Sequence, residues 1–172
     1  MKEKYYGKLE SPEIKKVKKE NIHLTLLFLG YFPEEKIKEI KEKTGKIQKE
    51  KFVLGIKGIG SFNSRIIFLE IEKGKEKIKE IYSEICKAME MPKEKFTAHA
   101  TIARNKKMNS KEFGELVEEL KKISFEKEFE VKSFELMESE LHSSGPEYKT
   151  VYSFNLKNYN SSETLSRTSV GL

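Results

Sequence analysis

Short stretches of alternating apolar and polar residues recur along this chain. Side chains in a β-strand point alternately to the two faces of a sheet, so alternation of this kind predicts strands with one buried face. A polar segment at residues 61–64 separates two of these stretches and predicts a β-hairpin. The predicted strands lie at residues 21–29, 52–60, 65–72, 96–104, near 124–138 and near 147–156.

Three further segments carry apolar residues at intervals of three and four, which is the spacing of a buried helical stripe. The first follows Pro33, a favoured residue in a first helical turn, and the second follows Gly74. The third begins at Asn109 and Glu112, which are spaced as in a capping box. The stripes are Ile37, Ile40, Thr44 and Ile47; Ile78, Ile81, Tyr82 and Ile85; and Phe113, Leu116, Val117 and Leu120. Helices packed on mostly antiparallel sheets predict an α+β protein.

The two ends of the chain lack this patterning. The first 20 residues contain no convincing core strand, and the residues after Lys157 form a polar, aperiodic tail. We therefore expect a single folded domain over residues 1–157 and a disordered tail over residues 158–172. With 37% hydrophobic residues, the 172-residue chain can fill a core without disulfides or structural metals.

The charged residues are unusual in kind. Every acidic residue is a glutamate, which excludes Ser-His-Asp triads, Asp-based magnesium sites and EF-hand loops. The net charge of +6 would attract a polyanion, but lysines and glutamates are interleaved, so it supports RNA as a partner only weakly. A single cysteine, Cys86, excludes an internal disulfide framework, and no apolar run is long enough to span a membrane. These features predict a soluble, cytoplasmic protein.

One short motif occurs twice. His23-Leu-Thr25 and His99-Ala-Thr101 both read His-x-Thr, and each lies in a predicted strand. Alternation puts the imidazole and the hydroxyl of each motif on the same face of its strand. Two such strands facing each other would suit a phosphate, because imidazoles and hydroxyls can both hydrogen-bond its oxygens.

A zinc site is the competing interpretation of two histidines. It would need further ligands, and besides glutamates the chain offers only Cys86 and His142. We interpret Cys86 as a packed thiol on a helix and His142 as a turn histidine outside the site. No metal and no cofactor is therefore expected.

At these residues the sequence resembles the two-histidine phosphoesterases, and within them the RNA 2′,3′-cyclic phosphodiesterases, also called 2′-5′ RNA ligases (LigT/ThpR-like). The resemblance covers roughly residues 17–157 and implies two pseudo-symmetric lobes of mostly antiparallel sheet, with helices outside and an active-site cleft between them. The blocks that carry it are His23-Leu-Thr-Leu-Leu-Phe-Leu-Gly30, Gly58-Ile-Gly60-Ser-Phe62, Phe96-Thr-Ala-His99-Ala-Thr101-Ile-Ala-Arg104, and Ser139-x-Leu141 followed by Gly145-Pro146-x-Tyr148. The N-terminal strand and helix of the family are shortened here, and Ala98 replaces a proline often found before the second histidine.

The resemblance implies a hydrolase that opens a 2′,3′-cyclic phosphate at an RNA end, leaves a 2′-phosphate and needs no metal. Acid–base catalysis needs one proton donor and one acceptor, and two imidazoles can fill both roles near neutral pH. We take His23 as the acid and His99 as the base, although the near-symmetry of the motifs leaves this assignment open. By resemblance, the catalytic pair is His23 and His99, and the substrate-binding residues are Thr25, Thr101, Arg104 and Tyr148.

Two alternatives stay open at this point. The chain could be an RNA-end-binding protein without turnover, an idea motivated by its short N-terminus, or it could ligate RNA through 2′-5′ bonds. The substrate could equally be a small cyclic nucleotide or a tRNA half. We expect a monomer in which the N-terminal segment, the strand at 147–156 or the tail covers an otherwise open sheet edge near His23.

Overall fold

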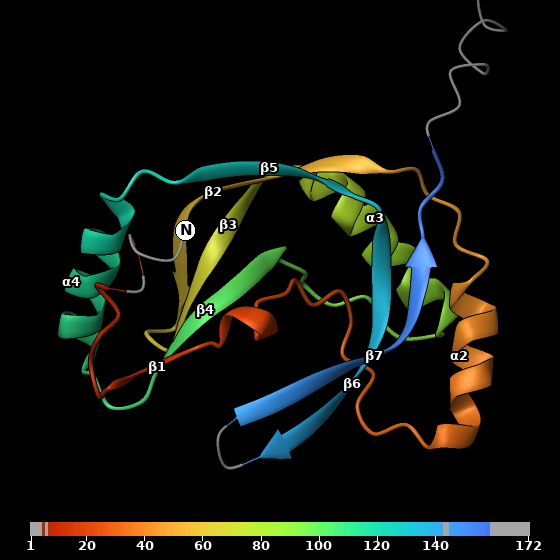
Figure 1. Ribbon diagram of the computed structural model, residues 1–172, viewed down its shortest axis with the longest axis horizontal. Coiled ribbons are helices and arrows are strands. Elements are labelled where there is room, and N and C mark those ends of the chain that lie inside the picture. The colour runs from red at the N-terminus through yellow and green to blue at the C-terminus, as the bar shows by residue number, and fades with distance from the viewer. Residues whose placement is uncertain (1–4, 6, 143–144, 159–172) are drawn as a thin grey trace, which may run out of the picture.

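The computed structural model describes residue 5, residues 7–142 and residues 145–158. In this part of the chain, helices pack on two antiparallel sheets (Figure 1). One sheet has five strands in the order β1-β4-β3-β2-β5, and the other consists of β6 and β7. The strands are β1 (Ile14–Lys16), β2 (Phe52–Phe62), β3 (Ile66–Lys73), β4 (His99–Asn105), β5 (Glu126–Val131), β6 (Ser133–His142) and β7 (Gly145–Asn155). The predicted α+β class is confirmed.

The hairpin of β2 and β3 forms because residue patterning and turn chemistry agree. On β3, Ile67, Leu69 and Ile71 are buried on one face of the sheet. Asn63 and Ser64 in the turn take positive φ angles of 49° and 50°, which polar turn residues tolerate better than branched ones. The predicted hairpin is therefore confirmed.

The three predicted helices are also present. They are α2 (Ile37–Thr44), which follows the 3-10 turn η2 (Glu34–Lys36), α3 (Lys75–Ala88) and α4 (Ser110–Lys121). At the start of α4, the Asn109 side chain accepts hydrogen bonds from the backbone N–H groups of Lys111 and Glu112, each at 3.0 Å. The Glu112 carboxylate accepts one from the Asn109 N–H at 3.3 Å, which completes the predicted capping box.

Helices cover only one face of the large sheet. Phe113, Val117 and Leu120 of α4 share a buried cluster with Ile67 and Leu69 of β3. In α3, Ile78 packs against Leu54 and Ile71 of the large sheet. Ile81 and Ile85 of the same helix pack against Phe134 and Phe154 of the small sheet. The opposite face of the large sheet therefore remains available for a site. Among the described residues, no helix is long and apolar enough to cross a membrane.

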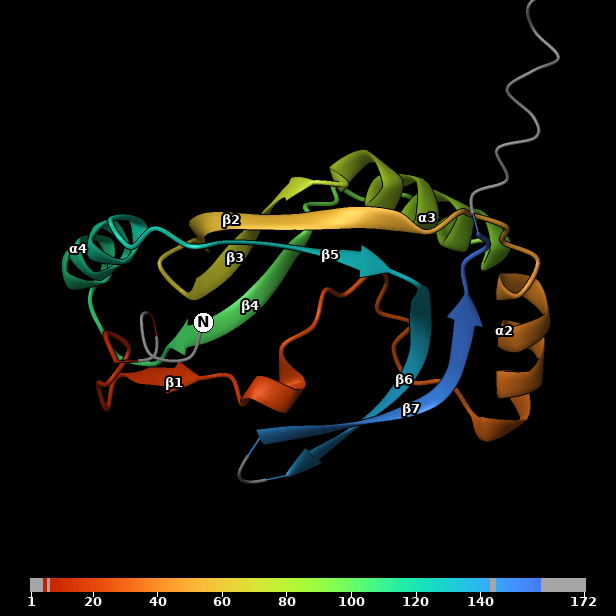
Figure 2. The same ribbon diagram turned by 45° about the horizontal axis from the view of Figure 1, so that its top comes forward.

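The single strand predicted near 124–138 is wrong in one respect, because it is divided between two sheets. β5 pairs with β2, whereas β6 begins one residue later and pairs with β7. Figure 2 shows the chain turning sharply between the two strands. Alternation predicts which face a side chain takes, but not which strand its backbone pairs with.

The first 20 residues, where the sequence shows no convincing core strand, add the three-residue strand β1 at the edge of the large sheet. Residues of β1 pair antiparallel with β4, from Ile14 opposite Asn105 to Lys16 opposite Ala103. Tyr5, Leu9 and Ile14 are buried in the same cluster as α4. A three-residue strand with one inward side chain is too short for alternation to reveal it.

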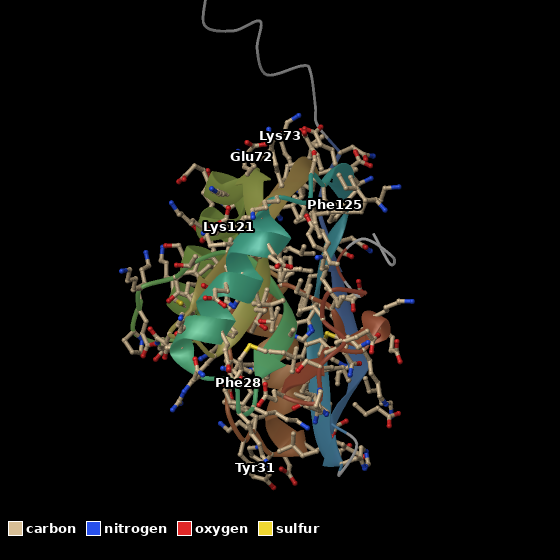
Figure 3. The ribbon with its side chains drawn as sticks, turned by 90° about the vertical axis from the view of Figure 1, so that its left-hand side faces the viewer. Phe28, Tyr31, Glu72, Lys73, Lys121 and Phe125 are labelled. Carbon is tan, nitrogen blue, oxygen red and sulfur yellow. The ribbon has the colours of Figure 1, made fainter. Side chains whose placement is uncertain are left out.

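The strand predicted at 21–29 forms only an isolated antiparallel bridge between Leu24 and Ala100. Leu26 and Leu27 both pack against buried clusters, which breaks the strict alternation. Beyond them, Phe28 is 75% exposed and Tyr31 is 95% exposed, and Figure 3 shows Tyr31 at the lower end of the molecule. Together with β1, this segment follows one edge of β4 with the 3-10 turn η1 (Lys19–Asn21) inserted.

The predicted disorder of residues 158–172 concerns residues outside the described part of the chain, except for Asn158. Its side-chain oxygen accepts a hydrogen bond from the Lys51 ammonium at 2.6 Å. Lys157 forms a parallel bridge with Glu50, which ties the end of the described chain to the start of β2.

Candidate active site

The Leu24–Ala100 bridge brings the two His-x-Thr motifs side by side. In an antiparallel bridge, the residues on either side of the bridged pair also lie opposite one another. His23 therefore lies across from Thr101, and Thr25 lies across from His99. Opposite side chains have Cβ atoms about 5 Å apart and diagonal ones roughly 7–8 Å apart, so the two imidazoles are close enough to share one small ligand.

All four motif side chains share one face of the sheet. Ala100 is 5% exposed in the core cluster beneath α4, and Leu24 packs against a buried cluster nearby. The residues that flank this pair must point the other way, because side chains alternate. Within each motif the imidazole and the hydroxyl therefore lie on the same face of the strand. The Leu24–Ala100 bridge puts both motifs on the same face of the sheet.

The two imidazoles are held in the same manner. The Nδ1 atom of His23 lies 2.8 Å from the Asn21 carbonyl oxygen, and that of His99 lies 2.7 Å from the Thr97 carbonyl oxygen. A carbonyl oxygen can only accept, so each Nδ1 carries a hydrogen and donates it. In each neutral ring the Nε2 atom is then the basic nitrogen, and in each protonated ring its proton is the one that can be given away.

Aromatic residues of the β2–β3 hairpin position His99. The Phe62 and Phe68 rings contact the imidazole edge-on, with centroid distances of 5.1 Å and 5.2 Å. Phe68 itself packs over Gly60 of β2, where a Cβ atom would come within 2.4 Å of its ring. Gly60 and Phe62 of the Gly58-Ile-Gly60-Ser-Phe62 block therefore shape the packing around the second histidine.

The small sheet supplies the corresponding contact for His23. The Tyr148 ring of β7 meets the imidazole edge-on at a centroid distance of 4.7 Å. Next to it, the Asn21 side-chain amide donates a hydrogen bond to the Pro146 carbonyl at 2.7 Å. The site thus lies where the first motif, β4 and the β6–β7 hairpin come together, with Tyr148 beside His23 as a lining residue.

Arg104 reaches the site face because of an irregularity in β4. Strict alternation would put it on the face opposite His99, five residues earlier. The pairing with β3 shifts by one residue between Thr101 and Ala103, and both Ile102 and Ala103 are buried. This β-bulge reverses the alternation, so the exposed Arg104 side chain shares a face with His99 and Thr101.

Two charged residues on this face were not predicted from the sequence. Glu70 of β3 lies opposite His99, and Lys15 of β1 lies opposite Arg104. The Lys15 ammonium also comes near Gly145 at the start of β7, 3.5 Å from the position that a Cβ atom would take there. Neither residue has a local sequence signal, because lysines and glutamates occur throughout the chain.

The residues considered as zinc ligands lie elsewhere. Cys86 is buried in α3, and the His142 Nε2 atom lies near two carboxylates of the β6–β7 hairpin, 3.5 Å from Glu140 and 3.7 Å from Glu147. Over the described ranges, no group of three or more histidine, cysteine or acidic side chains is placed to hold a metal ion.

Two histidine–hydroxyl pairs on one open sheet face can supply a proton donor, a proton acceptor and hydrogen bonds to a phosphate ester. Comparison with known proteins identifies the family. The sequence model of the 2′-5′ RNA ligase superfamily matches residues 3–142, and the chain belongs to this superfamily. The resemblance seen in the sequence motifs is therefore confirmed.

Several relatives are named RNA 2′,3′-cyclic phosphodiesterase. The one from Archaeoglobus fulgidus is 32% identical over 148 residues, which is 82% of this chain and 83% of the relative. The one from Methanocaldococcus jannaschii is 36% identical over 155 residues, which is 86% of this chain and 88% of the relative.

Solved structures share the fold. The crystal structure of a Thermus thermophilus protein, TT0787, superposes with a TM-score of 0.73 at 25% identity, covering 90% of this chain and 88% of that one. Escherichia coli LigT complexed with 3′-AMP gives a TM-score of 0.70 at 21% identity, and the match covers 90% of this chain and 87% of the LigT chain.

Proposed function

We propose that this protein hydrolyses the 2′,3′-cyclic phosphate at the end of an RNA strand and leaves a 2′-phosphate, without a metal ion. The observation that carries the proposal is the Leu24–Ala100 bridge, which sets both His-x-Thr motifs on one face. The shared name of the relatives from Archaeoglobus and Methanocaldococcus supports the same reaction.

The reaction needs a proton acceptor and a proton donor at one phosphorus. Water attacks the phosphorus while the bond to the ribose 3′ oxygen breaks, so one group takes a proton from water and another gives one to the departing oxygen. We assign His99 as the base and His23 as the acid, each acting through the Nε2 atom left available by its Nδ1 hydrogen bond.

The remaining site residues bind the substrate in this proposal. The Thr25 and Thr101 hydroxyls donate hydrogen bonds to the non-bridging phosphate oxygens, where charge develops. Arg104 adds a guanidinium, whose planar fork suits phosphate oxygens. Tyr148, edge-on to His23, lines the site and offers a surface against which a base can stack.

Replacement of each histidine tests the proposal. With a short RNA that ends in a cyclic phosphate, and EDTA present, we expect the wild-type protein to open the ring. His23→Ala and His99→Ala should each lower kcat by about a hundredfold or more, as expected for the loss of a general acid or base. His142→Ala is the matched control and should keep full activity, because the His142 imidazole lies near the Glu140 and Glu147 carboxylates and not beside His23 or His99.

The outcomes separate the alternatives. Full activity in both histidine variants, or loss of wild-type activity with EDTA, would refute the mechanism. Binding of the RNA without any product would favour an end-binding protein instead. That alternative was motivated by the short N-terminus, which contributes the three-residue edge strand β1. The same reaction mixtures, analysed for longer RNA, detect 2′-5′ ligation.

A further inference from the structure

Two cations face each other at the edge of the proposed site. Lys15 and Arg104 are direct partners in the antiparallel pairing of β1 and β4. Like charges that lie directly opposite in a sheet destabilise it. Within the described part of the chain, no carboxylate forms an ion pair with either residue, although many other lysines are paired with glutamates. A bound anion would relieve this repulsion.

The position of the pair points to the kind of anion. Arg104 lies three residues beyond Thr101 on β4. At about 3.3 Å per residue this is roughly 10 Å along the strand, or roughly 7 Å if the bulged residue adds no length. The β-bulge turns it onto the same face as the His-x-Thr motifs. A phosphate that contacts Lys15 is therefore distinct from one that lies between the two histidines, yet it is within reach of the next one or two nucleotides of the same strand.

The Lys15 ammonium also lies close to the β6–β7 hairpin. It lies beside Gly145, at the start of the strand that carries Pro146 and Tyr148. From Gly145 to Tyr148, β7 thus runs along the same side as the segment from Lys15 to His23, with Asn21 bonded to Pro146 between them. The two cations and the catalytic pair consequently border one continuous surface.

We propose that Lys15 binds the phosphodiester group next to the reacting cyclic phosphate, with Arg104 between the two phosphates. The inference rests on the proposed function and extends it to the substrate class. A chain of at least two nucleotides can use Lys15, whereas a mononucleoside cyclic phosphate has no second phosphate to offer. The preferred substrate is therefore an oligoribonucleotide.

Lys15→Gln is the test, with two substrates measured side by side. Relative to wild type, kcat/KM for a trinucleotide that ends in a 2′,3′-cyclic phosphate should fall at least about five times more than kcat/KM for a mononucleoside 2′,3′-cyclic phosphate, because only the trinucleotide loses a charge-assisted contact. Lys111→Gln, which removes the same charge from an exposed position on α4, is the control and should affect both substrates equally.

Salt dependence gives a second readout. Binding of a trinucleotide with a 2′-phosphate, measured over a range of salt, should show a log–log slope that is smaller by about 0.7 in Lys15→Gln, the value for one lost contact to a single-stranded phosphate. Because a like-charge repulsion is removed, the melting temperature of Lys15→Gln should equal or exceed that of wild type.

The failures are distinguishable. If wild-type protein opened neither substrate, the proposed function would fail and this inference with it. If wild type opened both while Lys15→Gln lost the same factor on each, or matched Lys111→Gln on the trinucleotide, only the role of Lys15 would be refuted. A lower melting temperature combined with equal losses would show that Lys15 is structural.

Discussion

Gly60→Ala is the substitution that tests most directly how the hairpin holds His99. A Cβ atom at position 60 would lie 2.4 Å from two atoms of the Phe68 ring and 2.9 Å from a Glu70 carboxylate oxygen. The Phe68 ring is 5% exposed and is confined between Phe62 and His99. It can therefore yield to the new methyl group only by pushing on one of these two rings, and Phe62 itself contacts the imidazole.

The expected size of the effect follows from this confinement. Overpacking a filled core costs about 1–3 kcal/mol. For a chain of this length, each kcal/mol lowers the melting temperature by about 2–4 °C, so we expect a fall of about 2–12 °C. A displacement of a catalytic group by about 1 Å can cost up to a hundredfold in rate, so kcat should fall by about 10- to 100-fold.

Calorimetry and a cyclic-phosphate hydrolysis assay measure the two effects. Gly114→Ala in α4 is the matched control, since nothing lies within 4 Å of a Cβ atom there. It should raise stability by about 0.5–1 kcal/mol, because alanine is the better helix former, and leave activity intact. In a Phe68→Ala background, Gly60→Ala should lose most of its cost. A Gly60→Ala protein with the melting temperature and kcat of wild type would refute this account of how His99 is positioned.

Two further predictions concern stability away from the site. Asn109→Ala removes the capping box of α4, so it should cost about 1 kcal/mol and lower the melting temperature by about 2–4 °C while kcat stays unchanged; an equal loss of activity would mean that α4 does more than cover the core. The pKa of Glu39 is lowered by its hydrogen bond to Lys36 and then by that to Lys43. A carboxyl group with a lowered pKa stabilises the fold above its unfolded pKa and loses that contribution as the pH falls through its folded pKa. The difference in melting temperature between wild type and Glu39→Gln should therefore shrink as the pH falls from about 5 toward about 2, and added salt should shrink it at neutral pH; a difference that stayed constant with pH would contradict the ion pair.

The sequence determined those features that depend on neighbours in the chain. Alternation over residues 52–60 and 65–72 and the polar turn between them were enough to predict the first hairpin, because strand, turn and burial signals agree locally. The helical stripes and the capping box at Asn109 could also be predicted, because they depend only on residues a few positions apart in the chain. The His-x-Thr motifs indicated the family, and within each motif the period of two already put imidazole and hydroxyl on one face.

Tertiary structure decided which residues and strands pair with one another. No pattern in the sequence shows that Leu24 bridges Ala100, since backbone pairing between residues so far apart in the chain depends on the whole fold. Lys15, one of many lysines, gains its significance only from lying opposite Arg104. Arg104 itself would face away from His99 if β4 alternated strictly. The bulge at Ile102 and Ala103 reverses that, because burying two successive apolar side chains in the core cluster beneath α4 outweighs regular pairing with β3.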